Sequence, residues 1–154
     1  MSTFEDIVAA AVEAGSRSPC NKSKRGVVIF YADEDSYSII SSGNNAPPLP
    51  FVCDGSDACR SSCNKVAIHA EEAAILRALS LGSSIFDADM LHVKVVDGKA
   101  VPGGGPSCWQ CSRSILKANL SGMWLLHAEG WKYYSAYEFH KQTLIECELH
   151  VGVK

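Results

Sequence analysis

The residues best suited to chemistry in this sequence are a histidine, a glutamate and a pair of cysteines. One alanine separates His69 from Glu71, and Cys108 and Cys111 form a later Cys-x-x-Cys pair. A zinc ion held by one imidazole and two thiolates keeps its fourth tetrahedral position open for water. Glu71 can carry protons for that water without binding the metal. The pattern predicts a catalytic zinc site with His69, Cys108 and Cys111 as ligands and Glu71 as the catalytic residue.

Two alternatives follow from the same residues. A fourth ligand from another cysteine would close the zinc site and make it purely structural. Glu71 could also be a helix-surface glutamate like Glu72, although a single residue step places the two side chains on different faces. The position of Glu71 directly after His-Ala favours the catalytic interpretation.

The spacing H-x-E followed later by C-x-x-C resembles the signature of the zinc-dependent nucleobase deaminases. The segments 18–20, 26–29 and 39–45 resemble the amino-terminal half of deoxycytidylate deaminases, and 68–76 with 82–85 is similar to their active-site helix and exit loop, especially in phage-type members. Two positions depart from that family. Ser107 stands where proline usually precedes the first cysteine, and Asn44 replaces a common aromatic residue.

The resemblance implies a fold and a reaction. The expected fold class is α/β, a three-layer α/β/α cytidine-deaminase-like domain with a five-stranded mixed sheet whose last two strands are parallel. The expected reaction is hydrolytic deamination of a cytosine nucleotide, most simply dCMP to dUMP and ammonia, by zinc-activated water with Glu71 as proton shuttle. Relatives assemble into oligomers, so a homo-oligomer is expected.

Three residues are candidates for substrate binding. Asn45 occupies the position where family members carry an asparagine that contacts the nucleoside sugar, although Asn is also common as a left-handed turn residue. Ala70 lies between His69 and Glu71. Trp109, next to both cysteine ligands, offers a stacking surface.

Four further cysteines could form a second, structural zinc site. Some phage-type deoxycytidylate deaminases carry an additional zinc here, and pinning a long loop would offset its ordering entropy. Free or partly buried thiols are the alternative. The four residues are Cys20, Cys53, Cys59 and Cys63.

Phosphate recognition would distinguish a nucleotide from a nucleoside. Arginine can clamp phosphate through two hydrogen bonds, and a glycine run such as 103–105 can cradle it through backbone amides, although such a run is more often a hinge or a turn. Basic residues expected to border the pocket are Arg17, Lys22, Lys24, Arg25, Arg60 and Lys65.

Length and composition fit a single zinc-dependent deaminase domain over 1–154, because a chain of 154 residues can bury about two-thirds of its unfolded surface. The net charge of −3 favours a small-molecule substrate over nucleic acid. No stretch approaches the roughly 20 apolar residues that span a bilayer, so no membrane association and a cytoplasmic location are expected. Seven cysteines without an export signal favour metal binding over disulfides.

Hydrophobic periodicity and turn residues predict the order of elements. Helices are expected over 3–14, 66–81, 108–118 and 135–147, and strands over 26–31, 37–42, 91–96, 123–127 and 149–153. The segment 44–64 is expected to be an irregular loop. A helix between the last two strands permits a parallel crossover. Deoxycytidylate and transfer-RNA adenosine deaminases have such an ending, whereas free cytidine deaminases end in an antiparallel hairpin.

Other functions remain open at this level. One alternative is a polynucleotide deaminase that acts on cytosine or adenosine in single-stranded DNA or tRNA. Another is a non-catalytic, zinc-stabilised binding protein on the same scaffold.

Overall fold

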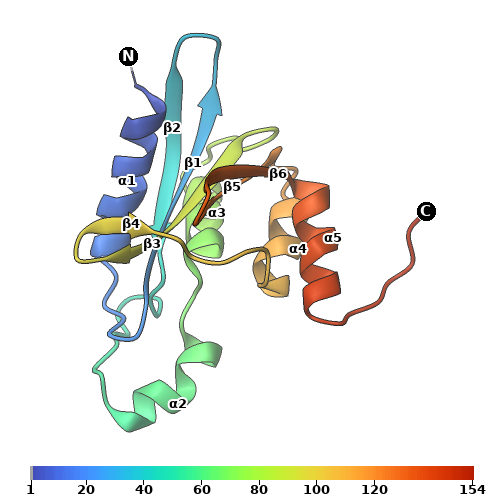
Figure 1. Ribbon diagram of the computed structural model, residues 1–154. Helices are drawn as coiled ribbons and strands as arrows, with labels where there is room; N and C mark the ends of the chain where they lie inside the picture. The colour runs from blue at the N-terminus through green and yellow to red at the C-terminus, as the bar shows by residue number, and fades with distance from the viewer. Residues whose placement is uncertain (1) are drawn as a thin grey trace.

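A mixed β-sheet forms the middle layer of the computed structural model, which describes residues 2–154 (Figure 1). The strands lie in the order β2-β1-β3-β5-β6, and β4 pairs with β3 outside this path. Their bounds are β1 Lys24–Ala32, β2 Tyr37–Asn44, β3 Asp89–Val96, β4 Lys99–Val101, β5 Gly122–His127 and β6 Gly130–Ser135. β3 and β5 are parallel, while the other pairs are antiparallel. This confirms the predicted α/β class with a mixed sheet.

Helices cover both faces of the sheet, which gives the predicted three-layer arrangement. Helix α1 (Phe4–Ser16) packs on β1 and β3 from one side, and helix α3 (Ala70–Ser80) packs on β2 and β1 from the other. Helix α4 (Trp109–Lys117) and helix α5 (Ala136–Glu146) contact each other on the α3 side. Helix α2 (Asp57–Val66) lies away from the sheet (Figure 1).

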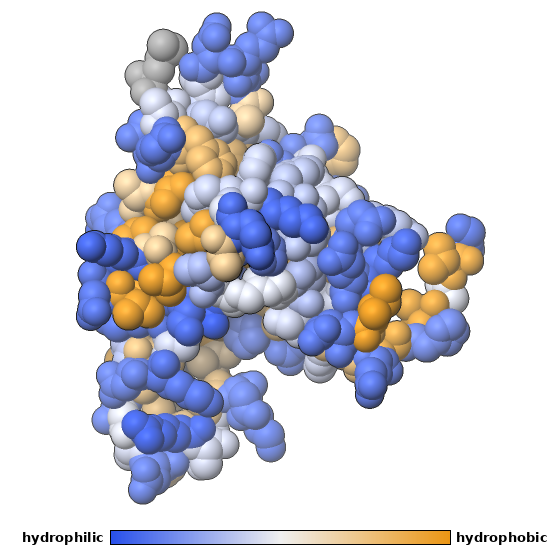
Figure 2. Space-filling view, in the orientation of Figure 1, coloured by the Kyte–Doolittle hydropathy of each residue, from blue (hydrophilic) through white to orange (hydrophobic). Residues whose placement is uncertain are grey.

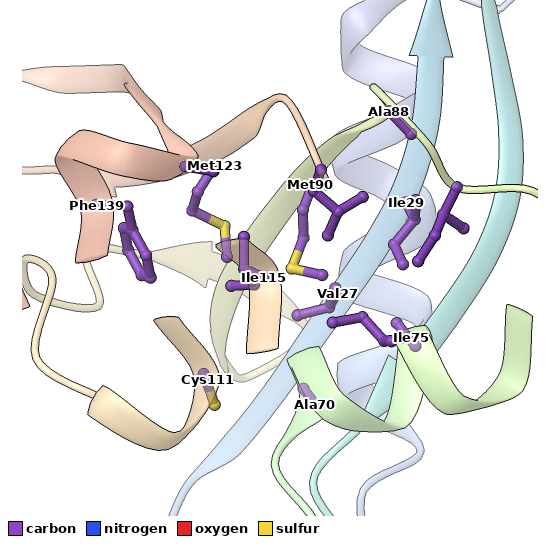
Figure 3. Close-up of a cluster of buried hydrophobic side chains, with 14 of the residues drawn as sticks. Val27, Ile29, Ala70, Ile75, Ala88, Met90, Cys111, Ile115, Met123 and Phe139 are labelled. Atoms are coloured by element: carbon purple, nitrogen blue, oxygen red, sulfur yellow. The ribbon is translucent and has the colours of Figure 1, made fainter. Parts of the chain in front are cut away.

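The larger hydrophobic core fills the space between the sheet and helices α3, α4 and α5. Figure 3 shows strand residues such as Val27, Ile29 and Met90 facing side chains of these helices. Ala70 and Cys111, at the starts of α3 and α4, belong to the same cluster. The core therefore extends up to the residues that were expected to hold the metal.

Helix α1 shows how a glycine can serve packing instead of ending a helix. Thr3 caps the helix and forms a capping box with Asp6, so the helix begins one residue after the predicted start at residue 3. The helix continues past Gly15 to Ser16. A Cβ on Gly15 would lie 2.9 Å from the backbone nitrogen of Gly26, so the two glycines allow α1 and β1 to approach closely.

The predicted parallel pairing of the last two strands is wrong. β5 pairs with β6 as an antiparallel hairpin, from Gly122 opposite Ser135 to His127 opposite Gly130. The predicted strand 149–153 is not formed, and its apolar side chains are exposed. The aromatic residues of 131–134 have high β-propensity and follow a glycine turn, so they take the edge position that a crossover strand would need.

Two further elements were not predicted. The expected irregular segment 44–64 contains the start of α2, which is capped by the Ser56 side chain. The short strand β4 returns from β3 through Asp97 and Gly98, both with positive φ, as a two-residue hairpin requires. Both elements are brief and depend on local turn and capping residues.

Across residues 2–154, every helix is too short or too polar to cross a membrane. Figure 2 shows apolar surface over α1 and the β3–β4 hairpin, and again in the carboxyl-terminal segment, where Leu149, Val151 and Val153 are exposed.

Candidate metal and substrate site

Two helix amino termini meet at the candidate metal site. His69 is the N-cap residue of α3, and Cys108 is the N-cap residue of α4, where its sulfur accepts a hydrogen bond from the Cys111 backbone N–H. The exposed amides at these helix starts favour negative charge, including thiolates. The two helix starts therefore converge on the predicted ligands.

The three predicted ligands lie close enough to share one ion. His69 Nδ1 is 3.2 Å from Cys111 Sγ and 3.3 Å from Cys108 Sγ, and all three donor atoms lie within 4.8 Å of one another. In a tetrahedral zinc site, bond lengths of about 2.1 Å to nitrogen and 2.3 Å to sulfur place such atoms about 3.5 Å apart. The donor set and its spacing fit zinc. Among residues 2–154 this is the one group of three such ligands.

The three predicted ligands change one another's pKa values. Hydrogen bonding from Cys111, together with His69, lowers the pKa of Cys108 to about 5. The same contact with Cys108, then burial and the charge of Glu71, raises the pKa of Cys111. Contact with Cys108 raises the pKa of His69 to about 8, against the opposing effect of burial. Without metal at neutral pH, the site therefore holds a Cys108 thiolate, a Cys111 thiol and a protonated His69.

Glu71 lies beside the ligands without joining them. Its Oε2 accepts a contact from the Cys111 thiol at 3.5 Å, and its Oε1 lies 3.9 Å from Nε2 of His92 on β3. Its side chain is only 13% exposed. A buried carboxylate next to the metal ligands can accept and donate protons where water would be bound.

The site opens into a cavity of about 350 Å³, within the size range of small-molecule sites. The predicted metal ligands His69 and Cys108 line it, together with Glu71. Apolar walls come from Leu125 and Phe139. The polar lining consists of Lys22, Ser23, Arg25, Asn45, His92, Ser107 and residues 103–105.

Asn45 lines the cavity and also organises its edge. Its Nδ2 donates to the Ser23 carbonyl at 2.7 Å, and its Oδ1 accepts from the Arg25 backbone N–H at 2.8 Å. The neighbouring Asn44 donates from Nδ2 to the Ala14 carbonyl at 3.0 Å. Asn45 thus fixes the backbone that carries Arg25, and one amide hydrogen of Nδ2 remains available to a ligand.

Of the six basic residues expected to border the pocket, two reach it. Lys22 and Arg25 line the cavity. Arg25 donates from Nε to Ser23 Oγ at 3.0 Å and from Nη1 to the Gly103 carbonyl at 3.3 Å, which leaves guanidinium donors free for an anion. Arg17 instead pairs with Glu13, and Lys24 donates to the Ser16 carbonyl. Arg60 and Lys65 are exposed on α2.

No protein-family model matches the chain, and no curated protein matches it in sequence. Solved structures do match in fold. The dCMP deaminase of cyanophage S-TIM5, in complex with dCMP and dUMP, superposes with a TM-score of 0.57 at 21% identity over 80% of this chain and 82% of that one. The cytidine deaminase of Burkholderia pseudomallei gives 0.58 at 14% identity over 90% and 96%. The cytidine deaminase of Mycobacterium tuberculosis gives 0.51 at 15% over 86% and 91%.

The chain has the cytidine deaminase-like fold. The sequence identities are too low to transfer an activity, so the comparisons establish the architecture on which the site is built.

Within that fold, the two remaining substrate-binding candidates, Ala70 and Trp109, differ in their position relative to the cavity. Ala70 is buried against the core and lines the cavity. Trp109 is 41% exposed and is not part of the cavity lining. The guanidinium carbon of Arg113 lies 4.8 Å from the centroid of the Trp109 ring.

The four cysteines of the suggested second zinc site are brought together only in part. Cys53 and Cys59 have their sulfurs 3.7 Å apart, close to the roughly 3.8 Å edge of a zinc thiolate tetrahedron. Cys20 accepts from the Ser23 backbone N–H, and Cys63 donates to the Arg60 carbonyl. In the described part of the chain, these cysteines do not form a group of three adjacent ligands.

The lining residues that were missed from the sequence include His92, Leu125 and Phe139. Leu125 and Phe139 look like ordinary core residues of a strand and a helix. His92 offered a signal, because it stands on the inward side of an apolar strand, where the alternating neighbours Met90 and Lys94 share its face. Burial lowers the pKa of His92, with Glu71 opposing and Arg25 reinforcing that effect.

Proposed function

We propose that this chain is a zinc-dependent hydrolytic deaminase of a cytosine nucleotide, with dCMP as the first candidate substrate. The observation that carries the proposal is the convergence of His69, Cys108 and Cys111 beside Glu71, at a cavity lined by His69, Cys108 and Glu71. A scaffold protein would not need a buried carboxylate at that position. The fold shared with dCMP and cytidine deaminases supports the same reaction.

The residues of the site have distinct roles in this proposal. Bound zinc would supply hydroxide near neutral pH by lowering the pKa of a coordinated water. Glu71 would accept one water proton and deliver it to N3 of the cytosine ring. It would then pass the remaining proton of the added hydroxyl group to the amine, so that ammonia leaves as the carbonyl forms. Leu125 and Phe139 would hold the base and exclude bulk water from the reacting carbon. The backbone at Ala70 would border the base beside Glu71.

Recognition of a phosphate is the reason to place a nucleotide first. Lys22 and Arg25 line the cavity, as do residues 103–105. Arg25 is held in place by Ser23 and Gly103 and so is pre-organised to bind an anion. Asn45, which fixes the backbone of this segment, is proposed to contact the sugar with its remaining amide hydrogen.

A free cytosine nucleoside is the second candidate, and the carboxyl-terminal hairpin favours it. β5 and β6 are antiparallel, which is the arrangement expected of free cytidine deaminases and not of deoxycytidylate deaminases. The cytidine deaminase of Burkholderia pseudomallei also covers 90% of this chain. The basic residues that line the cavity therefore favour a nucleotide, whereas the antiparallel hairpin favours a nucleoside. The reaction is the same for both substrates.

Ammonia release by the zinc-loaded protein separates these candidates. The substrate panel comprises dCMP, CMP, dCTP, deoxycytidine, cytidine, cytosine, guanine and a cytosine-containing single-stranded oligonucleotide. Preference for dCMP, with KM for dCMP but not deoxycytidine raised by Arg25→Met, supports the nucleotide enzyme. Equal or better use of nucleosides supports the second candidate. Activity on the oligonucleotide alone, or none on the whole panel, contradicts both.

We also propose that the chain forms a homo-oligomer. Several large apolar side chains on α3 and the loop after it are more than half exposed: Leu76, Leu79, Leu81 and Phe86. Apolar surface gathered on one element is commonly covered in an assembly. Sedimentation velocity over a range of concentrations tests this, with a monomer at all concentrations as the contradicting result.

A further inference from the structure

His92 is an unexpected residue at its place in the sheet. It lies in the middle of β3, is 9% exposed, and pairs in register with Val27 on β1 and Leu125 on β5. Its two cross-strand neighbours are apolar, as expected of an inner strand. An imidazole buried in such surroundings is costly unless its nitrogens find partners.

No fully buried side-chain nitrogen or oxygen among residues 2–154 is left without a hydrogen-bond partner. The ring of His92 instead lines the cavity. Its nearest ionic partner is Glu71, whose Oε1 lies 3.9 Å from Nε2. That distance is about 1 Å too long for a hydrogen bond. The other oxygen of Glu71, Oε2, faces Cys111 at 3.5 Å.

Glu71 therefore lies between a metal ligand and a buried imidazole. The glycine loop limits how far the imidazole can move away from it. A Cβ on Gly103 would lie 3.5 Å from Cε1 of His92, and Gly103 is tied to β5 through its N–H to the Leu126 carbonyl at 3.3 Å. A side chain at position 103 would therefore reach the edge of the ring, which faces the glycine loop.

We propose that His92 is a positioning residue that donates from Nε2 to Oε1 of Glu71 when substrate closes the site, which keeps Oε2 on the metal side. This inference rests on the proposed deaminase function of Glu71. Hydrogen bonds of a reacting group are often long without substrate and shorten in the complex. Because Glu71 must serve successive proton transfers, a donor that fixes one oxygen keeps the other aligned with the reacting atoms.

A purely space-filling role is the alternative, and two substitutions separate the roles. His92→Leu keeps most of the volume but removes the N–H, while His92→Gln retains an N–H donor near the position of Nε2. In the zinc-loaded enzyme we expect His92→Leu to lower kcat about 10- to 100-fold with little change in KM, because the carboxylate loses alignment. His92→Gln should recover a large part of this loss.

The control is His127→Gln, which alters another partly buried histidine on a neighbouring strand. His127 is hydrogen-bonded to Tyr134 at 2.8 Å and is not in the cavity lining. We expect kcat to stay within about 3-fold of wild type, because the alignment of Glu71 is unchanged. Equal kcat losses in His92→Leu and His127→Gln, or no recovery in His92→Gln, would overturn the positioning role.

A spectroscopic arm makes the test independent of turnover. Nitrogen-15 NMR of the histidine rings should show Nε2 of His92 protonated, with resonances that shift in Glu71→Gln and stay unchanged in Glu72→Gln. Identical His92 resonances in wild type and Glu71→Gln would overturn the inference even if the enzyme is active. If the His92 resonances shift in Glu71→Gln but no substrate reacts, the proposed function fails, whereas the contact between His92 and Glu71 stands.

Discussion

Gly43 on β2 lies directly against the first turn of α3. A Cβ on Gly43 would be 2.6 Å from the Ala70 carbonyl oxygen and 2.6 Å from the Ala74 backbone nitrogen. Both atoms belong to the helix backbone, which cannot rotate away as a side chain can. The close approach of β2 therefore determines where α3 begins and, with it, the positions of His69 and Glu71.

Gly43→Ala should destabilise the fold and loosen the metal site together. Overpacking against a fixed backbone typically costs about 1–3 kcal/mol. We expect a free energy of unfolding lower by this amount and weaker zinc binding, measured by denaturation and by competition with a chelator. Gly152→Ala is the control, because a Cβ there meets no neighbouring atom. Wild-type zinc affinity in a destabilised Gly43→Ala would contradict the link between β2 and the site.

Glu71→Gln should separate metal binding from catalysis. The amide keeps the shape of the carboxylate but cannot move protons, so we expect kcat to fall on the order of 100- to 10,000-fold while zinc per chain is unchanged. Metal analysis and ammonia release measure the two quantities. Glu72→Gln changes the adjacent carboxylate, which does not line the cavity, and should leave kcat near wild type. Residual activity of Glu71→Gln near that of wild type would exclude a proton-shuttle role.

Zinc binding should release protons, in a number that falls as pH rises. With the pKa of His69 raised to about 8 and that of Cys111 raised as well, both hold a proton at pH 7, whereas Cys108, with a pKa of about 5, does not. Zinc needs a neutral imidazole and two thiolates, so binding should release about two protons at pH 7 and about one at pH 9.

The apparent zinc affinity should therefore rise with pH and rise less steeply above pH 8. Calorimetry in buffers of different ionisation enthalpy measures the protons released at each pH. Release that does not change between pH 7 and pH 9 would show that His69 is already neutral at pH 7.

Asn45→Ala should weaken both the cavity edge and substrate binding. The substitution leaves the Ser23 carbonyl and the Arg25 N–H without their side-chain partners, at a cost of about 1–3 kcal/mol for buried groups. We expect lower stability and a raised KM. Asn44→Ala removes a similar bond, to Ala14, from a residue outside the cavity lining, so it should lower stability alone. Equal KM values in the two variants would limit Asn45 to a structural role.

A second zinc site at the loop cysteines would give the wild-type protein a higher zinc content than variants that lack these thiols. If Cys53 and Cys59 bind a second ion with Cys20 and Cys63, the wild-type protein should contain about two zinc ions per chain. The double substitution Cys59→Ser and Cys63→Ser should then reduce this to about one without changing the catalytic site. The control is Cys147→Ser, because the Cys147 thiol contacts the Ser107 carbonyl and not the loop cysteines. One zinc ion in the wild-type protein would exclude the second site.

The clustering of His69, Cys108 and Cys111 was predictable because metal-binding chemistry is carried by residue type and spacing. His69 and Cys108 take the N-cap positions of helices whose patterns were also visible in sequence. The partners of the last strands were not predictable in the same way, since both 131–134 and 149–153 are apolar enough to pair. Only packing against β5 decides between them. His92 was missed because a histidine on the inward side of an apolar strand does not reveal its partner until the fold brings Glu71 within 3.9 Å of it.

The bridge between Ala46 and Ile68 has a consequence for how this chain can vary. The two residues exchange backbone hydrogen bonds of 3.1 and 2.8 Å, which closes the base of the excursion that carries α2. None of residues 57–66 is buried, so the excursion adds little to the core. His69 follows the closed base directly. The segment 47–67 is therefore a natural insertion point, where length and sequence can diverge between descendants of one ancestor while the catalytic helix keeps its place.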